Sequence, residues 1–294
     1  MKAVKEKAYA KINLSLNVVG RRADGFHDVE TVMHTVSLAD EITVEVFPSR
    51  MSDVTLRFDG ECRLPTDDRN IALKAARLYL DRAGISDSVN ITLVKNIPVA
   101  AGLAGGSTDA AAVLRALNKL YDKRLSTKAL LSLAAELGSD VPFCLLGGTA
   151  LCLGRGERIE RLPDVRGLDL VIAVADGEHI STPEAYSELD RLYSDFDGSV
   201  RGNGDLLTQR LLCSVKGGEI DPSSLYNIFE EAILPRCEGA SAIKARMLEL
   251  GALGALMSGS GPSVYGIFDT EDSARRATEV LKNNGVRAYL AKSV

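Results

Sequence analysis

The glycine-rich stretch from residue 98 to residue 118 carries the clearest signs of chemistry in this chain. It reads PVAAGLAGGSTDAAAVLRALN, with three glycines and a Ser-Thr pair directly before a strongly helical run. Glycines permit positive φ angles and a close approach of the backbone to a ligand, and the start of a helix offers unpaired N–H groups and partial positive charge. Upstream, residues 89–96 alternate apolar and polar types like a half-buried strand. The order strand, glycine loop, helix predicts a phosphate-binding loop.

The spacing of this loop matches neither of the two common phosphate motifs. No lysine precedes Ser107, and the glycines do not fall at first, third and sixth places. Tight packing of a helix on a sheet would also explain small residues here. Ser107 or Thr108 could cap the helix, which contributes roughly 0.5 to 2 kcal/mol, and Asp109 in the first turn would suit the helix dipole. Two adjacent hydroxyls lead to the hypothesis that one caps while the other faces a phosphate or its magnesium.

Composition narrows the class of protein. With 294 residues and 46% hydrophobic content, the chain can form two ordinary domains. Its net charge of -5 comes without a basic stripe, so no nucleic-acid partner is expected. No segment resembles a signal peptide or a membrane span, which predicts a soluble, cytoplasmic protein. Five cysteines without a CxxC pair predict reduced, mostly buried thiols, and the three scattered histidines form no metal-binding pair. We expect any metal to arrive with a nucleotide.

The pattern of apolar residues predicts an α+β fold. Strands are expected at residues 10–20, 29–38, 40–47 and 53–60, then a helix from 71 that closes at Gly84, a helix at 127–137 and a returning strand at 147–154. After a polar stretch, the order strand, helix, strand, strand, helix, strand at 168–292 is typical of ferredoxin-like domains. The boundary is placed near residue 163. The segment SGSGPS at 258–263 most simply forms a hairpin turn, although it could also line a cleft.

Four segments carry a resemblance to a known family. The loop PVAAGLAGGSTDAA resembles the second motif of the GHMP kinases, which phosphorylate small molecules. Together with residues 8–33, 138–157 and 257–268, it resembles over nearly the whole chain a branch that uses ATP and Mg²⁺ to phosphorylate the tertiary 2-hydroxyl of a CDP-linked methylerythritol in non-mevalonate isoprenoid biosynthesis. The resemblance implies an N-terminal α/β nucleotide-binding domain at 1–163, a ferredoxin-like domain at 164–294, and an active site in the cleft between them.

The same resemblance assigns catalytic roles to two residues. Lys11 in AKINL matches the family's catalytic lysine, and Asp140 in GSDVPF matches its catalytic aspartate. Phosphoryl transfer depends on positioning and charge stabilisation more than on a strong base, so these residue types suit the reaction. Without the resemblance, Lys11 could face solvent from a strand and Asp140 could cap a helix. Asn13 shares the strand face of Lys11, which puts both side chains in one site, and the family uses it on the substrate.

Binding residues follow from the resemblance as well. Around the cytosine it places Phe26, where the family commonly has tyrosine, with His27 and Tyr186, and it brings Thr182 to the diphosphate or the reacting hydroxyl. Asn70 and Lys95 would reach the adenine, although they could merely start a helix and end a strand. Ala104 stands where glycine is frequent and is tolerated unless that position needs a positive φ angle. The loop residues assigned to ATP are Pro98, Val99, Ala100, Ala101, Gly102, Leu103, Ala104, Gly105, Gly106, Ser107 and Thr108, the last in place of a frequent serine.

Two rival functions remain open. A different GHMP kinase, such as a mevalonate or homoserine kinase, would share the loop but lack the cytidine pocket, which the ADGFH turn and Tyr186 favour. A nucleotide-binding protein without catalysis would have no need for both Lys11 and Asp140. The sequence does not decide between a monomer and a homodimer.

Overall fold

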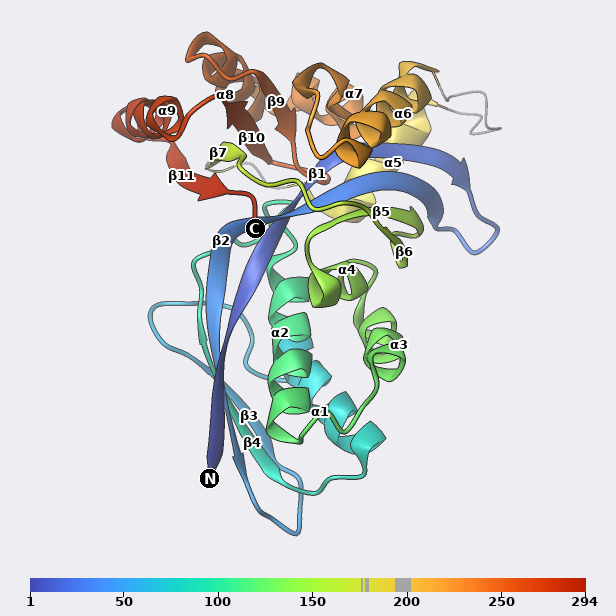
Figure 1. Ribbon diagram of the computed structural model, residues 1–294, viewed down its shortest axis with the longest axis vertical. Coiled ribbons are helices and arrows are strands. Elements are labelled where there is room, and N and C mark those ends of the chain that lie inside the picture. The colour runs from blue at the N-terminus through green and yellow to red at the C-terminus, as the bar shows by residue number, and fades with distance from the viewer. Residues whose placement is uncertain (176, 178–179, 194–201) are drawn as a thin grey trace. The chain divides into compact units, whose positions relative to one another are not determined.

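The computed structural model describes residues 1–294 except 176, 178–179 and 194–201 (Figure 1). The chain divides into two compact units. The first unit comprises Met1–Ala10, Ala39–Pro98 and Ala104–Gly147, and the second comprises Lys11–Leu38, Val99–Leu103 and Gly148–Val294. The chain therefore passes more than once between the units, and the glycine-rich loop contributes residues to both. The boundary near residue 163 stays a prediction.

The first unit packs helices on a sheet. The beginning of β1 (Lys2–Arg21) and the end of β2 (His27–Phe47) belong to it, β4 (Ser88–Val94) pairs antiparallel with β2, and β3 (Val54–Phe58) pairs parallel with β4. The helices are α1 (Ile71–Ala83), α2 (Gly105–Leu120), α3 (Thr127–Leu137) and α4 (Val141–Leu146). Figure 1 shows them gathered on one side of these strands. The alternating burial of β4 confirms the half-buried strand before the loop.

Local signals explain where the first helices begin and end. The side chain of Asn70 accepts a hydrogen bond from the N–H of Ala72, and Gly84 ends α1 at a φ of 64°. Ser126 caps α3 in the same way by accepting from the N–H of Ala129. The predicted helices at 71–84 and 127–137 are confirmed.

The two strands expected at 29–38 and 40–47 form one strand, β2, so that division was wrong. Asp40, at the start of the second expected strand, is fully buried, and its Oδ1 accepts hydrogen bonds from the backbone N–H groups of Asn96 and Ile97, at 2.5 and 2.8 Å. These bonds satisfy the carboxylate inside the unit, so the strand continues through it.

The second unit contains a four-stranded antiparallel sheet. Its strands β7 (Asp169–Val174), β9 (Gly254–Met257), β10 (Ser263–Phe268) and β11 (Arg287–Lys292) lie in the order β11-β7-β10-β9. Along the chain, helix α8 (Glu238–Glu249) lies between β7 and β9, and helix α9 (Glu271–Asn283) lies between β10 and β11. Both helices contribute apolar residues to the same core. This order confirms the predicted ferredoxin-like arrangement.

The remaining parts of β1 and β2 also belong to the second unit. β5 (Thr149–Gly154) pairs with β2 from Val29 to His34, β6 (Arg158–Arg161) pairs with β5, and the short β8 (Tyr226–Asn227) pairs parallel with β1 at Ser15 and Leu16. The other helices are α5 (Thr182–Leu192), α6 (Gly202–Lys216) and α7 (Phe229–Ile233), with short 3₁₀ turns at Pro222–Ser224 and Leu234–Arg236.

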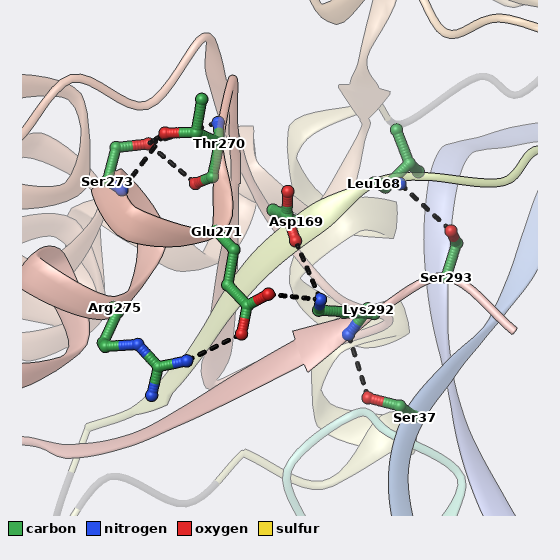
Figure 2. A network of polar contacts seen from close by, with 9 residues as sticks. All are labelled: Ser37, Leu168, Asp169, Thr270, Glu271, Ser273, Arg275, Lys292 and Ser293. Atoms are coloured by element: carbon green, nitrogen blue, oxygen red, sulfur yellow. Dashed lines mark hydrogen bonds and ion pairs between the residues drawn. The ribbon is translucent and has the colours of Figure 1, made fainter.

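The C-terminal residues join the ferredoxin-like sheet to β2 inside the second unit (Figure 2). The backbone N–H of Lys292 donates to Ser37 Oγ at 2.9 Å, and the N–H of Leu168 donates to Ser293 Oγ at 3.0 Å. The ammonium of Lys292 pairs with Glu271 of α9 at 2.6 Å. The end of β11 is therefore fixed to three different segments of its unit.

The five cysteines are reduced thiols, as predicted. Cys144, Cys152 and Cys237 are buried, Cys62 is half-buried and Cys213 is exposed. Among the described residues, no helix combines the length and apolarity needed to cross a bilayer.

Candidate active site

A buried polar face of β1 forms the centre of the candidate site in the second unit. Lys11, Asn13, Ser15 and Asn17 alternate along the strand and are all buried. The ammonium of Lys11 donates to Asn13 Oδ1 at 2.7 Å, and Asn13 Nδ2 donates to Thr31 Oγ1 at 2.8 Å. The structure thus brings Lys11 and Asn13 together. Their roles in catalysis and substrate binding stay predictions.

The second-unit part of the glycine-rich loop, Val99–Leu103, lies against the turn between β9 and β10. Ser258 Oγ donates to the carbonyl of Gly102 at 3.1 Å, and Ser263 Oγ donates to the carbonyl of Ala101. Gly102 has a φ of 73°, and a Cβ there would meet the carbonyl oxygen of Ser258 at 2.1 Å. The backbone N–H of Lys11 donates to the carbonyl of Leu103 at 3.3 Å. The SGSGPS hairpin turn therefore also supports the loop beside Lys11.

The start of α2 differs from the prediction in its cap. The helix begins at Gly105, and Ala104 precedes it with φ 57° and ψ 30°, without a capping side chain. Ser107 and Thr108 lie within the first turn, and Thr108 Oγ1 instead donates to the carbonyl of Tyr9 at 2.6 Å. The predicted hydroxyl cap is wrong because the helix starts at Gly105, before both hydroxyl residues. Ala104 needs the positive φ angle that its residue type disfavours.

The prediction that Asp109 lies in the first turn of the helix, where it would suit the dipole, is wrong. Asp109 is buried, and Oδ2 accepts from the ammonium of Lys95 at 2.8 Å. Lys95 also pairs with the buried Asp40 of β2. Burial and the Asp40 carboxylate raise the pKa of Asp109 to about 8, although Lys95 opposes this. A single ammonium is therefore shared by the carboxyl groups of Asp40 and Asp109.

The residues predicted at the adenine have well-defined partners in the first unit. Asn70 caps α1 and also donates from Nδ2 to the carbonyl of Pro65 at 2.9 Å. Burial on its own would lower the pKa of Lys95, but the charges of Asp109 and Asp40 outweigh it and raise that pKa. Its ammonium would lie 3.4 Å from a Cβ on Gly105. Lys95 therefore supports the start of α2, and adenine contacts of Asn70 and Lys95 stay predictions.

Asp140 precedes α4 in the first unit. Its side chain makes no capping hydrogen bond with this helix, which removes the alternative that it serves as a simple cap. Arg115 fixes α4 by donating to the carbonyl of Cys144 at 2.8 Å and to that of Lys7 at 3.0 Å. The carboxylate is thus held on a helix that is tied to both α2 and β1.

The three residues predicted around the cytosine lie in the second unit. The rings of His27 and Tyr186 stack with centroids 4.7 Å apart, and Asp190 Oδ1 lies 2.7 Å from His27 Nε2. Phe26 is 54% exposed, and the guanidinium of Arg155 lies 5.0 Å from its ring centre. His27 and Tyr186 thus form one stacked pair and Phe26 contacts Arg155, and the contact of these residues with a base stays a prediction.

Thr182 begins α5, directly after the capping residue Ser181. Its hydroxyl lies 3.4 Å from Ser260 Oγ in the β9–β10 turn. The predicted substrate residue therefore lies next to the same turn that contacts the glycine-rich loop.

Sequence reasoning missed the acidic partners of two predicted residues. Asp190 follows Tyr186 by four positions on α5, so the helical period could have placed both on one face. Asp40 offered no such signal, because it lies 55 residues before its partner Lys95.

Comparisons with known proteins define the class. The N-terminal domain of the GHMP kinases matches residues 70–148, and the C-terminal domain of the same kinases matches residues 218–287. A homoserine kinase from Cytophaga hutchinsonii has the same fold, with a TM-score of 0.80 at 22% identity over 100% of this chain and 96% of that one. The chain is a small-molecule kinase with the two-domain GHMP fold.

Closer relatives define the particular family. The 4-diphosphocytidyl-2-C-methyl-D-erythritol kinase of Gloeobacter violaceus is 40% identical over 100% of this chain and 95% of its own length. The kinase of the same name from Clostridium botulinum strain Langeland is 38% identical over 98% of this chain and 99% of its own length. A crystal structure of 4-(cytidine 5'-diphospho)-2C-methyl-D-erythritol kinase matches with a TM-score of 0.80 and 37% identity, covering 98% of each chain. The chain belongs to the 4-diphosphocytidyl-2-C-methyl-D-erythritol kinase family.

Proposed function

We propose that this kinase transfers the γ-phosphoryl group of ATP to the 2-hydroxyl of 4-diphosphocytidyl-2-C-methyl-D-erythritol, a step of non-mevalonate isoprenoid biosynthesis. The observation that carries this proposal is the buried Lys11–Asn13 pair, which is joined through the N–H of Lys11 to the glycine-rich loop at Leu103. A buried ammonium beside a phosphate loop suits a reaction whose transition state spreads negative charge over phosphoryl oxygens. The full-length identity to named kinases supports the choice of substrate.

Catalysis and cytosine binding are assigned to separate groups of residues. Lys11 stabilises charge on the transferred group, Asn13 orients the acceptor, and Asp140 accepts the proton of the hydroxyl late in the transfer. His27, Tyr186 and Phe26 bind the cytosine, with the ring of Phe26 as an exposed stacking face. Asp190 beside His27 Nε2 orients the imidazole.

ATP fits the loop and the start of α2. Gly102 has the positive φ that a backbone cradle needs, and the first turn of α2 has no side-chain cap that would occupy its N–H groups. Ser107 lies in that turn and is partly exposed, so its hydroxyl can face a phosphate or Mg²⁺. When bound, Mg²⁺ neutralises charge on the phosphates. The proposal includes a cytoplasmic enzyme, either a monomer or a homodimer, without a nucleic-acid partner.

ADP release from Mg-ATP tests the reaction. Separate reactions contain 4-diphosphocytidyl-2-C-methyl-D-erythritol, its UDP-linked analogue, mevalonate or homoserine. We expect turnover with the CDP compound, weaker turnover with the UDP analogue and none with the other two alcohols. Turnover of mevalonate or homoserine alone would identify another GHMP kinase activity, and binding of ATP without any turnover would favour the non-catalytic alternative.

The variant Asp140→Asn tests the catalytic role of Asp140 in the same assay. Turnover should fall by at least tenfold while the affinity for the CDP compound stays near that of the wild type, because positioned acid–base groups contribute 10²- to 10⁴-fold. Asp81→Asn, at an exposed position on α1, is the matched control and should keep full activity. Unchanged turnover in Asp140→Asn would remove this residue from the mechanism.

A further inference from the structure

Asn227 at the end of β8 has no role in the reaction as described above, yet its side chain is one of the most constrained in the second unit. It is 2% exposed and makes three hydrogen bonds. Nδ2 donates to the carbonyls of Met257 and Gly259, at 2.7 and 2.8 Å, and Oδ1 accepts from the N–H of Phe229 at 3.0 Å. Since carbonyls can only accept and an N–H can only donate, the surroundings fix the orientation of the amide.

The two carbonyls that Asn227 holds lie on either side of one peptide group. That peptide carries the N–H of Gly259, which donates to Asn13 Oδ1 at 3.0 Å. Gly259 has a φ of 59°, so the turn uses a left-handed conformation at this point. Asn227 therefore fixes the direction in which the Gly259 N–H points.

Asn13 Oδ1 is the shared acceptor of two donors. It receives the N–H of Gly259 and, at 2.7 Å, the ammonium of Lys11. The hydroxyl of Tyr265 donates to the backbone carbonyl of Asn13 at 2.9 Å and fixes its main chain. If the Gly259 N–H moved, the carboxamide of Asn13 would keep its bond to Thr31 but lose one of the bonds that set its rotation, and Lys11 would lose a well-oriented partner.

The framework around Asn227 is rigid on both sides. β8 pairs with β1 at Leu16, and the N–H of Ile228 donates to the carbonyl of Leu16 at 2.9 Å. On the side of the turn, Glu230 Oε1 accepts from the N–H of Met257 at 2.8 Å, and Lys244 pairs with the same carboxylate. Asn227 is thus attached to the strand that carries Asn13 and Lys11.

We propose that Asn227 is a positioning residue for the Lys11–Asn13 pair and acts through the peptide N–H of Gly259. This inference rests on the proposed function, because it assumes that Lys11 and Asn13 act on the reacting groups. A buried amide with three partners also stabilises the fold, so the test must separate positioning from stability.

Asn227→Asp is the informative variant. It keeps the size of the side chain and the acceptor for Phe229, but it turns an oxygen toward the carbonyls of Met257 and Gly259. The matched control is Asn118→Asp in the first unit, where Asn118 likewise donates to the carbonyl of Leu125 at 3.1 Å and accepts from its N–H at 3.0 Å. Asn227→Ser, which keeps one donor, replaces Asn227→Asp if the latter does not fold.

Kinetics normalised to folded protein provide the first readout. We expect kcat of Asn227→Asp to fall at least tenfold with KM for ATP and for the acceptor within threefold, because the interaction acts on the transition state. Asn118→Asp should lower the melting temperature and leave kcat unchanged. Since Asn227 acts through Asn13, the double variant Asn13→Ala/Asn227→Asp should lose no more activity than Asn13→Ala alone.

Hydrogen exchange at the Gly259 amide provides a readout that does not depend on activity. Its protection should fall in Asn227→Asp and in Asn13→Ala but not in Asn118→Asp. Wild-type kcat in Asn227→Asp, or fully additive losses in the double variant, would overturn the proposal. Failure of the proposed function is seen separately as absent wild-type turnover of the CDP compound. If another alcohol is the acceptor, the same comparison with that alcohol decides whether Asn227 positions the pair.

Discussion

Ala104 adopts a left-handed backbone conformation, with φ 57° and ψ 30°, in the loop that we assign to ATP. An L-residue with a Cβ costs roughly 1 to 2 kcal/mol in this conformation, whereas glycine adopts it freely. The resemblance implies that glycine is frequent at this position, and the left-handed conformation would favour it. The loop keeps its path despite the methyl group because Thr108 and Tyr9 fix the first turn of α2.

Ala104→Gly should therefore stabilise the protein. The relieved strain exceeds the added flexibility of the unfolded chain, so we expect a gain of about 0.5 to 1 kcal/mol in the free energy of unfolding, measured by urea denaturation. Ala135→Gly on the exposed side of α3 is the matched control and should lose about 0.5 to 1 kcal/mol. Equal losses in both variants would show that the left-handed conformation at 104 carries no strain.

Contacts between side chains that are close in the sequence were predictable, whereas contacts between side chains far apart in the sequence were not. Lys11 and Asn13 are two positions apart on a strand, so their shared face follows from its period. Asp109 was misjudged because Lys95, which follows β4, and Asp40 of β2 come from distant parts of the chain. A pattern within α2 could not reveal that this carboxyl group is buried.

The hairpin turn and the glycine-rich loop meet so closely that neither could be interpreted alone. Glycine chemistry in SGSGPS suffices for a turn, which is why its sequence did not indicate a partner. The contact between Gly102 and Ser258 explains why glycine is needed at this point of the loop. Helix boundaries, by contrast, were predictable from Asn70, Gly84 and Ser126, whose effects are local.

Gly102→Ala should disrupt this contact. The new Cβ would lie 2.1 Å from the carbonyl oxygen of Ser258, at a φ of 73°, so the loop and the turn must separate. We expect a loss of about 2 to 4 kcal/mol in the free energy of unfolding, the sum of the left-handed conformation and overpacking against backbone, together with a raised KM for ATP.

Gly251→Ala separates the two causes. This glycine also has a positive φ, 93°, but nothing lies within 4 Å of an added Cβ. It should lose only about 1 to 2 kcal/mol and keep the wild-type KM. Equal effects of the two substitutions would mean that backbone strain, rather than the contact with Ser258, explains Gly102.

For the chain as a whole, the succession of helices and strands was easier to predict than their assignment to the two units. The strand order β11-β7-β10-β9 followed from the succession of strands and helices. Two domains were also expected, but the contribution of β1 and β2 to both units was not. Strands of this length exceed the usual range, and local patterns give no reason to expect them.

The pH dependence of global stability should reflect one buried histidine. His34 on β2 is fully buried, its Nδ1 bonds Thr149 Oγ1 at 2.8 Å, and its Nε2 has no hydrogen-bond partner. Burial lowers the pKa of His34 from 6.5 to about 4, against the opposing charge of Asp164. As the pH falls, His34 therefore binds a proton in the unfolded chain before it does so in the folded protein. The free energy of unfolding that is present above pH 6.5 should decrease as the pH falls toward 4, by up to about 3 kcal/mol.

His34→Gln removes this titration but keeps a polar side chain toward Thr149. It should be less stable than the wild type at pH 7.5, because it disturbs a packed site, yet the difference should shrink as the pH is lowered to 4.5. Urea denaturation at several pH values measures both proteins, and carboxylates that titrate in the same range contribute equally to each. A difference that stays constant with pH would mean that the proton taken up on unfolding in acid does not bind to His34.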